Sequence, residues 1–132
     1  MSEQTSSGVM AGKRGLIMGV ANDRSIGWGI ASKLAEHGAE LAFTFQGEAL
    51  QKRVIPLAES VGSNLVLPCD VTDEASVDAV FDRLKSEWGE LDFVLHAIAY
   101  SDKEELKGGY VDTSRDNFQR TMDISVYSFT EI

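Results

Sequence analysis

The sequence predicts an α/β fold in which helices cover both faces of a parallel sheet. Short apolar runs alternate along the chain with longer segments whose apolar residues recur at helical spacing. The short runs are almost wholly apolar, which indicates strands buried on both faces, as in a parallel sheet. The 132 residues are 43% hydrophobic and 25% charged, a composition typical of a globular chain. Right-handed crossovers between such strands give a doubly wound, Rossmann-type layer.

The first half of the chain predicts two strands and two helices. We expect strands over residues 16–18 and 41–45. An apolar stripe between them predicts a helix that ends near Gly38, and its members are Ile26, Ile30, Ala31, Leu34 and Ala35. The next stripe consists of Leu50, Val54, Leu57 and Val61 and closes at Gly62. Because proline removes a helical hydrogen bond, Pro56 predicts a kink or two short helices there.

The second half continues the same alternation. A strand is expected over 65–67, followed by a helix that Thr72 caps and Gly89 ends. The apolar face of this helix comprises Val77, Val80, Phe81, Leu84 and Trp88. We expect a fourth strand over 91–95, a loop over 97–112 and a last helix from near Ser114. The stripe of that helix comprises Phe118, Met122, Val126 and Phe129.

The ends of the chain predict one incomplete domain. Residues 1–12 are rich in Ser, Thr and Gly and are expected to form a flexible leader without the apolar core of a secretory signal. The chain stops at Ile132 inside an apparent helix, so residues 13–132 are expected to be the N-terminal part of a longer single domain. No apolar run approaches the length of a membrane span.

Charge and cysteine content argue against several classes of function. The formal net charge of −9 disfavours nucleic acid as a partner, since phosphate binding needs clustered Lys and Arg. The single cysteine, Cys69, allows no internal disulfide, is expected to be buried and fits a reducing cytoplasm. The two histidines, His37 and His96, are far apart and give no metal-ligand spacing.

The stretch GVANDRSIGWGIA, residues 19–31, follows the first predicted strand and predicts a phosphate-binding loop. Gly19 permits a tight turn, and Ala21 and Gly27 are small enough for close backbone approach to a diphosphate. Ser25 offers a hydroxyl, and the helix starting near Ile26 points free N–H groups at an anion. Gly29 is expected to let this helix pack close to the sheet. An ordinary strand-to-helix turn rich in Gly and Ser is the alternative.

The ends of the other strands carry further candidates. Gln46 stands where a dinucleotide site usually has an acidic residue that holds the adenosine ribose, and the absence of an adjacent cation favours NAD over NADP. Asp70 suits the adenine amino group and Val71 the adenine ring, although Asp70 is equally a turn residue before Thr72. Small residues over 97–99 let the backbone pass a nicotinamide ribose, or simply continue the strand.

Five segments together resemble a particular family. The segments GVANDRSIGWGIA, GAELAFTFQ, LPCDV, LDFVLHAIAY and DISVYSF are similar to those of bacterial enoyl-acyl-carrier-protein reductases of the short-chain dehydrogenase/reductase superfamily. The resemblance runs from Lys13 to Ile132. The longer loop with Ser25-Ile26, and His96 to Ala99 in place of Asn-Ala-Gly, distinguish this pattern from ordinary short-chain dehydrogenases.

The resemblance implies NADH-dependent reduction of the trans-2 double bond of an acyl chain on its carrier protein, in fatty acid biosynthesis. It also implies site residues: Gly19, Ala21, Ser25 and Ile26 at the dinucleotide, Gln46 near the adenosine, Asp70 and Val71 at the adenine, Ala97, Ile98 and Ala99 at the nicotinamide half. Tyr100 and Ser101 would border the acyl pocket, where inhibitors of the family bind. Ser101 stands where alanine is more usual.

The family's catalytic Tyr-x6-Lys pair is expected beyond Ile132. Tyr127 stands too early and has no lysine after it, so we expect no catalytic residue and no activity in these 132 residues alone. The resemblance also implies a cytoplasmic homotetramer with the helix from Ser114 at a subunit interface. Two alternatives remain: another short-chain oxidoreductase, such as a 3-oxoacyl reductase, or a non-catalytic nucleotide-binding module.

Overall fold

The computed structural model describes residues 8–132, which divide into two compact units. The first unit ends at Ala97 and holds a sheet with its covering helices, and the second spans Ile98–Ile132. Residues 1–7, which make up most of the expected leader, lie outside the described residues.

Four parallel strands form the sheet of the first unit. They are β1 (Arg14–Met18), β2 (Glu40–Phe45), β3 (Val66–Pro68) and β4 (Phe93–His96). Their order is β3-β2-β1-β4, and every neighbouring pair is parallel. The four predicted strands and their parallel pairing are therefore confirmed, with ends displaced by at most two residues.

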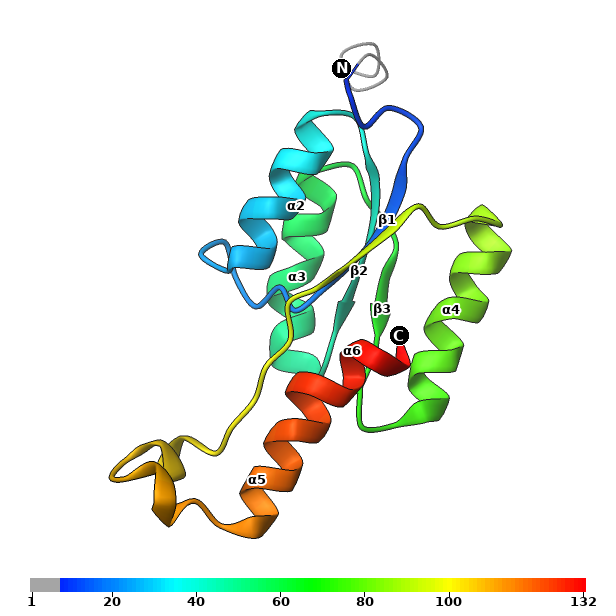
Figure 1. Ribbon diagram of the computed structural model, residues 1–132. Helices are drawn as coiled ribbons and strands as arrows, with labels where there is room; N and C mark the ends of the chain where they lie inside the picture. Colours follow the sequence, from blue (N-terminus) through cyan, green and yellow to red (C-terminus); the bar gives the residue numbers. More distant parts are fainter. Residues whose placement is uncertain (1–7) are drawn as a thin grey trace. The chain divides into compact units, whose positions relative to one another are not determined.

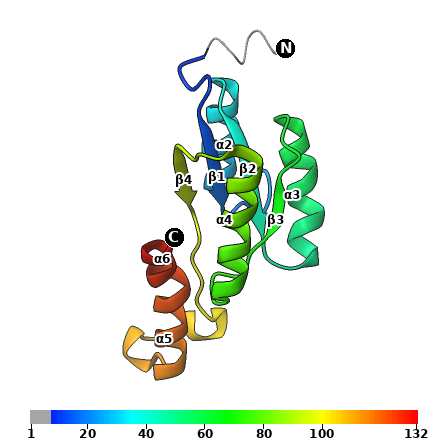
Figure 2. The same ribbon diagram turned by 90° about the vertical axis from the view of Figure 1, so that its right-hand side faces the viewer.

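Three helices cover this sheet. Helices α2 (Ile26–Glu36) and α3 (Glu48–Ser60) lie on one face, and α4 (Glu74–Trp88) lies on the other (Figure 1, Figure 2). The same division follows from the topology, because the chain reverses direction across the sheet after β3. The doubly wound, Rossmann-type fold predicted from the sequence is confirmed.

Small residues bring α2 close to the sheet. Its buried positions are Gly27, Ala31 and Ala35, whereas Ile26 is 81% exposed and Ile30 is 40% exposed. The predicted stripe is therefore wrong at its two isoleucines, although Ala31 and Ala35 are correct. The fully buried strand residues Ile17 and Phe43 fill the space beneath the helix, so a branched side chain on the inner face of α2 would have little room.

Helix α3 is one continuous helix with Pro56 inside it. The alternative of two short helices is therefore wrong. Pro56 is exposed, so water can reach the backbone carbonyl one turn earlier, which proline leaves without its usual amide donor. The predicted apolar stripe of α3 is confirmed: Val54 is fully buried, and Leu50, Leu57 and Val61 pack against the same core. Ala58, which is outside the predicted stripe, is fully buried as well.

Asp73, not Thr72, is the N-cap of α4. The Asp73 carboxylate accepts a 3.2 Å hydrogen bond from the amide of Ala75 in the first turn. The Thr72 hydroxyl donates to Asp70 Oδ1 at 2.6 Å, and Thr72 lies one residue before the N-cap position. The prediction placed the cap one residue too early, because both residue types are good N-caps and only the turn geometry separates them.

Residues 8–12, the end of the expected flexible leader, form a hydrogen-bonded turn. The amide of Met10 donates to the carbonyl of His37 at 2.8 Å, and the amide of Lys13 donates to the carbonyl of Met10 at 3.0 Å. The Met10 side chain packs against the core of the first unit. These contacts fasten the chain ahead of β1 to the end of α2.

The second unit is helical. Two short 3-10 helices, η1 (Lys103–Leu106) and η2 (Tyr110–Asp112), lie within the segment expected to be a loop. Helix α5 (Arg115–Met122) follows and starts near Ser114 as predicted, with Ser114 as its N-cap. It continues through a π-helical turn, η3 (Asp123–Tyr127), into α6 (Ser128–Glu131). Both carboxylate oxygens of Glu105 accept hydrogen bonds from Ser114, which ties η1 to the start of α5.

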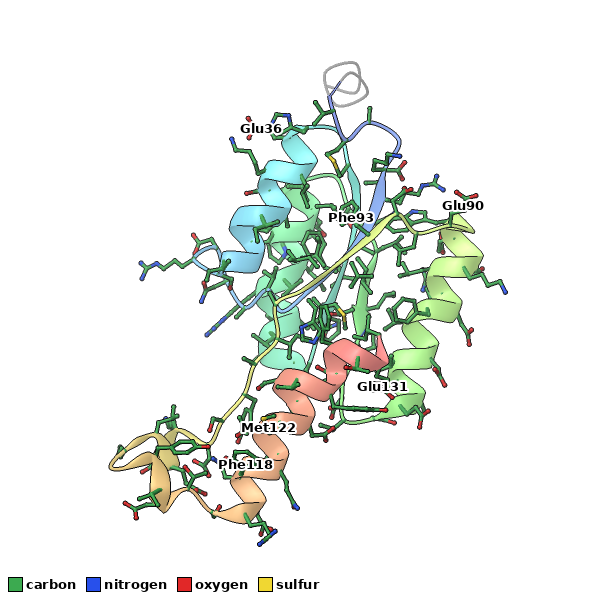
Figure 3. All side chains as sticks on the ribbon, viewed as in Figure 1. Glu36, Glu90, Phe93, Phe118, Met122 and Glu131 are labelled. Carbon is green, nitrogen blue, oxygen red and sulfur yellow. The ribbon has the colours of Figure 1, made fainter. Side chains whose placement is uncertain are left out.

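The predicted apolar stripe of the last helix is exposed. Phe118 and Met122, labelled on α5 in Figure 3, are 45% and 42% exposed, and Val126 and Phe129 are 50% and 69% exposed. A plain core-facing helix would bury these side chains. An exposed apolar stripe of this length is typical of a surface that another segment of the protein or another protein chain covers.

Candidate functional site

Four residues follow the carboxyl ends of the four strands: Gly19, Gln46, Asp70 and Ala97. Because the strands are parallel, these ends share one edge of the sheet. Backbone hydrogen bonds join neighbouring strand ends: the amide of Ala97 donates to the carbonyl of Met18 at 2.9 Å, and the amide of Cys69 donates to the carbonyl of Phe45 at 2.8 Å. Ligands of doubly wound folds bind outside this edge.

Gly19 is required by its backbone and by its neighbour. Its φ of +101° is a conformation that residues with a side chain rarely adopt. A Cβ atom at this position would also collide with the backbone carbonyl of Ala97. The positive φ fits the tight turn expected at Gly19, and the Ala97 carbonyl leaves no room for a side chain there.

Ser25 closes the loop between β1 and α2. Its Oγ accepts hydrogen bonds from the amides of Ala21, at 2.9 Å, and Asn22, at 3.1 Å. A hydroxyl has two acceptor lone pairs and one donor. Both lone pairs are engaged by the loop, so the remaining capacity of Ser25 is donation, which suits an anion.

The first turn of α2 has no side-chain cap. Ser25 is the N-cap residue, yet its side chain makes no capping hydrogen bond to the turn. The amide groups at a helix start can then bind an anion, helped by the helix dipole. Ile26, the first residue of the helix, is 81% exposed beside them. This local geometry is compatible with the predicted phosphate-binding loop, which stays a prediction.

The two glycines of α2 differ from their predicted roles. Gly27 is buried, and a Cβ there would lie 3.5 Å from the side chains of Val20 and Ala97, so this glycine faces the sheet instead of an anion. Gly29 is exposed, and a Cβ there would meet nothing within 4 Å. Gly27, not Gly29, therefore provides the close packing of helix against sheet.

Gln46 and Asp70 interact across the ends of β2 and β3. The Thr72 hydroxyl and the Thr72 amide both donate to Asp70 Oδ1, at 2.6 Å and 2.9 Å. These hydrogen bonds, and a weaker one from the Gln46 side chain, lower the pKa of Asp70, while partial burial acts in the opposite direction. Asp70 is therefore ionised at neutral pH and presents an acceptor at this edge.

The turn after β3 supports both interpretations of Asp70. The residue forms a turn with Thr72, as the structural interpretation expected, and Ser76 Oγ bonds to both its amide and its carbonyl. Its second carboxylate oxygen remains for a ligand, as the binding interpretation requires. Val71 is half-buried beside it, and Cys69 is buried, as predicted.

The second unit holds the other four candidates, Ile98, Ala99, Tyr100 and Ser101. Ile98 is half-buried and Ala99 is exposed. Ser125 Oγ accepts from the Tyr100 amide at 2.9 Å and donates to the Tyr100 carbonyl at 3.2 Å, so both peptide groups of this residue are bound to one side chain. The guanidinium of Arg120 stacks 4.7 Å from the centre of the Tyr100 ring.

Three polar residues of the last helix were missed by the sequence analysis. Asn117, Thr121 and Ser125 hold the segment 100–102 by side-chain hydrogen bonds. Their spacing of four residues places them on one face, next to the apolar stripe. This four-residue spacing of polar side chains is visible in the sequence and could have identified the three residues.

One Tyr-x6-Lys spacing does occur in the chain, at Tyr100 and Lys107. In a continuous helix this spacing brings the two side chains to the same face two turns apart. Here the intervening residues include only the short 3-10 helix η1, and the Lys107 ammonium pairs with Glu104 at 3.1 Å. Tyr100 and Lys107 therefore do not lie two turns apart on one face of a helix.

Residues 8–132 lack two kinds of feature. No helix there is both long enough and apolar enough to cross a membrane. Within the same described range, no three His, Cys, Asp or Glu side chains gather where they could hold a metal ion.

The β3-β2-β1-β4 parallel sheet, with its glycine turn and uncapped helix after β1, defines a protein of the Rossmann-type α/β class. Within this class, the chain belongs to the enoyl-(acyl carrier protein) reductase family, whose family model matches residues 19–132. The match covers the loop, all later strand ends and the whole second unit.

Three relatives illustrate the similarity. The chain is 66% identical to enoyl-[acyl-carrier-protein] reductase [NADH] 1 of Rhizobium meliloti, over 96% of this chain and 47% of that protein. It matches the crystal structure of FabI from Candidatus Liberibacter asiaticus with a TM-score of 0.93 and 58% identity, over 95% of this chain and 48% of that one.

The third relative, the reductase from Anaplasma phagocytophilum solved in complex with NAD, matches with a TM-score of 0.90 and 59% identity, over 93% of this chain and 47% of that one. The chain therefore spans about half the length of the relatives it matches.

Proposed function

We propose that residues 13–132 are the N-terminal, cofactor-binding part of an NADH-dependent enoyl-acyl-carrier-protein reductase. The observation that carries the proposal is the 66% identity to a relative named as an NADH enoyl-acyl-carrier-protein reductase, over 96% of this chain. The reaction is reduction of the trans-2 double bond of an acyl thioester in fatty acid biosynthesis.

The residues of the first unit fit a dinucleotide. The outward donor of Ser25 and the uncapped start of α2 suit a diphosphate, with Gly19, Ala21 and Ile26 around it. Gln46 and the ionised Asp70 supply hydrogen-bonding groups for the adenosine, and Val71 supplies an apolar contact for the adenine. When bound, NADH supplies the hydride, and the protein supplies orientation.

The preference for NADH over NADPH is assigned to Gln46. Its amide can donate to and accept from ribose hydroxyls, and it carries no charge. The ionised Asp70 beside it would repel a 2′-phosphate. Lys52 and Arg53 are exposed on α3, a turn or more along the chain from this end of β2, and are the nearest cations after Gln46 in sequence.

The reduction also needs a group that stabilises the enolate developing on the thioester oxygen. We assign this role to a Tyr-x6-Lys pair beyond Ile132, as the family resemblance implies, and not to Tyr127 or to Tyr100 with Lys107. Ala97, Ile98 and Ala99 are assigned to the nicotinamide half, and Tyr100 and Ser101 to the border of the acyl site.

The partners proposed are the acyl carrier protein that bears the substrate and further copies of this protein. The exposed stripe of Phe118, Met122, Val126 and Phe129 supports a subunit interface, and a homotetramer is the assembly the family resemblance implies. We place the protein in the cytoplasm, in line with its single, buried cysteine.

The test is NADH oxidation by the full-length protein that contains this chain. Crotonyl-coenzyme A serves as the thioester, NADPH as the competing cofactor, and a 3-oxoacyl thioester as the competing substrate. We expect turnover of crotonyl-coenzyme A with NADH and little with NADPH. Turnover of the 3-oxoacyl thioester alone would contradict the proposal and favour a 3-oxoacyl reductase, and no turnover of either would favour a non-catalytic module.

A further inference from the structure

The segment Tyr100–Asp102 is held in place by side chains of the last helix and not by strand or helix pairing. The amide of Tyr100 donates to Ser125 Oγ at 2.9 Å, and the amide of Asp102 donates to Asn117 Oδ1 at 3.0 Å. Between them, the Ser101 hydroxyl accepts from Asn117 Nδ2 at 3.1 Å and from Thr121 Oγ1 at 3.2 Å.

Asn117 is the centre of this arrangement. It is 7% exposed, the most buried residue of α5. The oxygen of its side-chain amide accepts from the Asp102 backbone amide, and the nitrogen donates to the Ser101 hydroxyl. One buried amide group therefore forms hydrogen bonds with two adjacent residues of the segment. A buried amide keeps its orientation because an unpaired end would be costly.

Thr121 forms a second hydrogen bond with Ser101, independent of Asn117. With Asn117 and Thr121 both donating, the two lone pairs of Ser101 Oγ are engaged and its proton is directed away from α5. The rotamer of Ser101 is thereby fixed by two residues, neither of which lies next to it in the sequence.

From this geometry we propose that Asn117 and Thr121 are positioning residues, which set Ser101 and the adjoining backbone at the border of the acyl-thioester site. The inference rests on the proposed function, since it assigns the segment 100–102 to the substrate and not to the cofactor. Neither residue touches the reacting atoms. Their effect reaches the substrate through Ser101, so loss of either contact raises the KM for the thioester and leaves the KM for NADH unchanged.

The experiment uses the full-length protein, with crotonyl-coenzyme A and NADH. Thr121→Val removes the donor hydroxyl and keeps the shape of the side chain, whereas Thr121→Ser keeps the hydroxyl. We expect Thr121→Val to raise the KM for crotonyl-coenzyme A about three- to tenfold, the range of one net hydrogen bond. The kcat and the KM for NADH are expected to change less than about twofold, and Thr121→Ser to restore the thioester KM.

A double-mutant comparison tests whether Thr121 acts through Ser101. Ser101→Ala removes the shared acceptor, so the Ser101→Ala/Thr121→Val protein should have the same thioester KM as Ser101→Ala alone. Gln119→Ala, at an exposed position of the same helix, is the matched control and should leave both KM values unchanged. Asn117→Ala should raise the thioester KM further, because it removes two contacts.

The outcomes separate the two proposals. An active wild-type protein whose thioester KM is the same in Thr121→Val, with an unchanged melting temperature, overturns the positioning role alone. An equal rise in both KM values together with a lower melting temperature also overturns it, because that is the effect of a purely structural contact. A wild-type protein without enoyl reductase activity overturns the proposed function, and the inference with it.

Discussion

At Gly19 two separate physical constraints exclude a side chain, and Gly29 is free of both. The φ of Gly19 is +101°, and a Cβ would collide with the Ala97 carbonyl at the end of β4. Gly29 lies within α2 with open space where its Cβ would be. The backbone and the packing therefore require glycine at position 19, whereas neither requires it at position 29.

The paired substitutions Gly19→Ala and Gly29→Ala test this difference. We expect Gly19→Ala to lower the free energy of unfolding by about 1–3 kcal/mol or more, because the strained backbone and the clash add together. Gly29→Ala should raise it by about 0.5–1 kcal/mol, since alanine favours the helix. Urea unfolding of the full-length protein measures both values. Equal effects at the two positions would contradict the assignment.

The site residues that could be predicted from the sequence are those whose position in the loop after the first strand explains the residue type. Gly19 and the loop position of Ser25 follow from the sequence, and the structure agrees. The roles of Gly27 and Gly29 were not predictable, because both are small and only the packed helix shows which one faces Val20 and Ala97. Asn117 is recognisable as a polar residue of the last helix, but its contacts were not predictable because its partners, Ser101 and Asp102, are 16 and 15 residues away.

At the scale of elements, neighbouring polar residues in the turn after β3 have different structural roles. Thr72 holds Asp70, and Asp73 caps α4. Glu74, next in the chain, places a further negative charge in the first turn, where it complements the helix dipole. The start of α4 and the orientation of the Asp70 carboxylate thus depend on different side chains.

Asp73→Ala tests the cap. We expect it to lower the free energy of unfolding by about 1 kcal/mol, because the Ala75 amide loses its acceptor. Asp73→Asn keeps an oxygen acceptor and should cost only a few tenths of that amount. Thermal or urea unfolding of the full-length protein gives both values. If Asp73→Asn is as destabilising as Asp73→Ala, the charge and not the cap is what stabilises this helix start.

The strands and most buried helix faces were predictable because their apolar patterns arise from burial in the core alone. Strand β1 is apolar and fully buried over residues 16–18, and Val54 and Ala58 of α3 face the core. Ile26 and Ile30 misled the prediction, because periodicity counts apolar residues without showing what covers them. At the start of α2, next to a candidate ligand site, exposed isoleucines are available for a ligand or another chain, not for the sheet.

At the scale of the whole molecule, the described sheet has two edges. Strands β3 and β4 each pair with one neighbour among residues 8–132, and Val94 in the middle of β4 is 37% exposed. Open strand edges invite pairing with other chains. The exposed stripe over Phe118, Met122, Val126 and Phe129 adds a second surface of the same kind.

A protein made of residues 1–132 alone is therefore expected to oxidise no NADH with crotonyl-coenzyme A and to self-associate. The first expectation follows because the pair assigned to enolate stabilisation lies beyond Ile132, and the second because the β4 edge and the apolar stripe are both uncovered. Light scattering and the NADH assay, run beside the full-length protein, measure the two properties. A monomer with full turnover would place the catalytic groups within these residues, and Tyr100 with Lys107 would then need to be tested first by Tyr100→Phe.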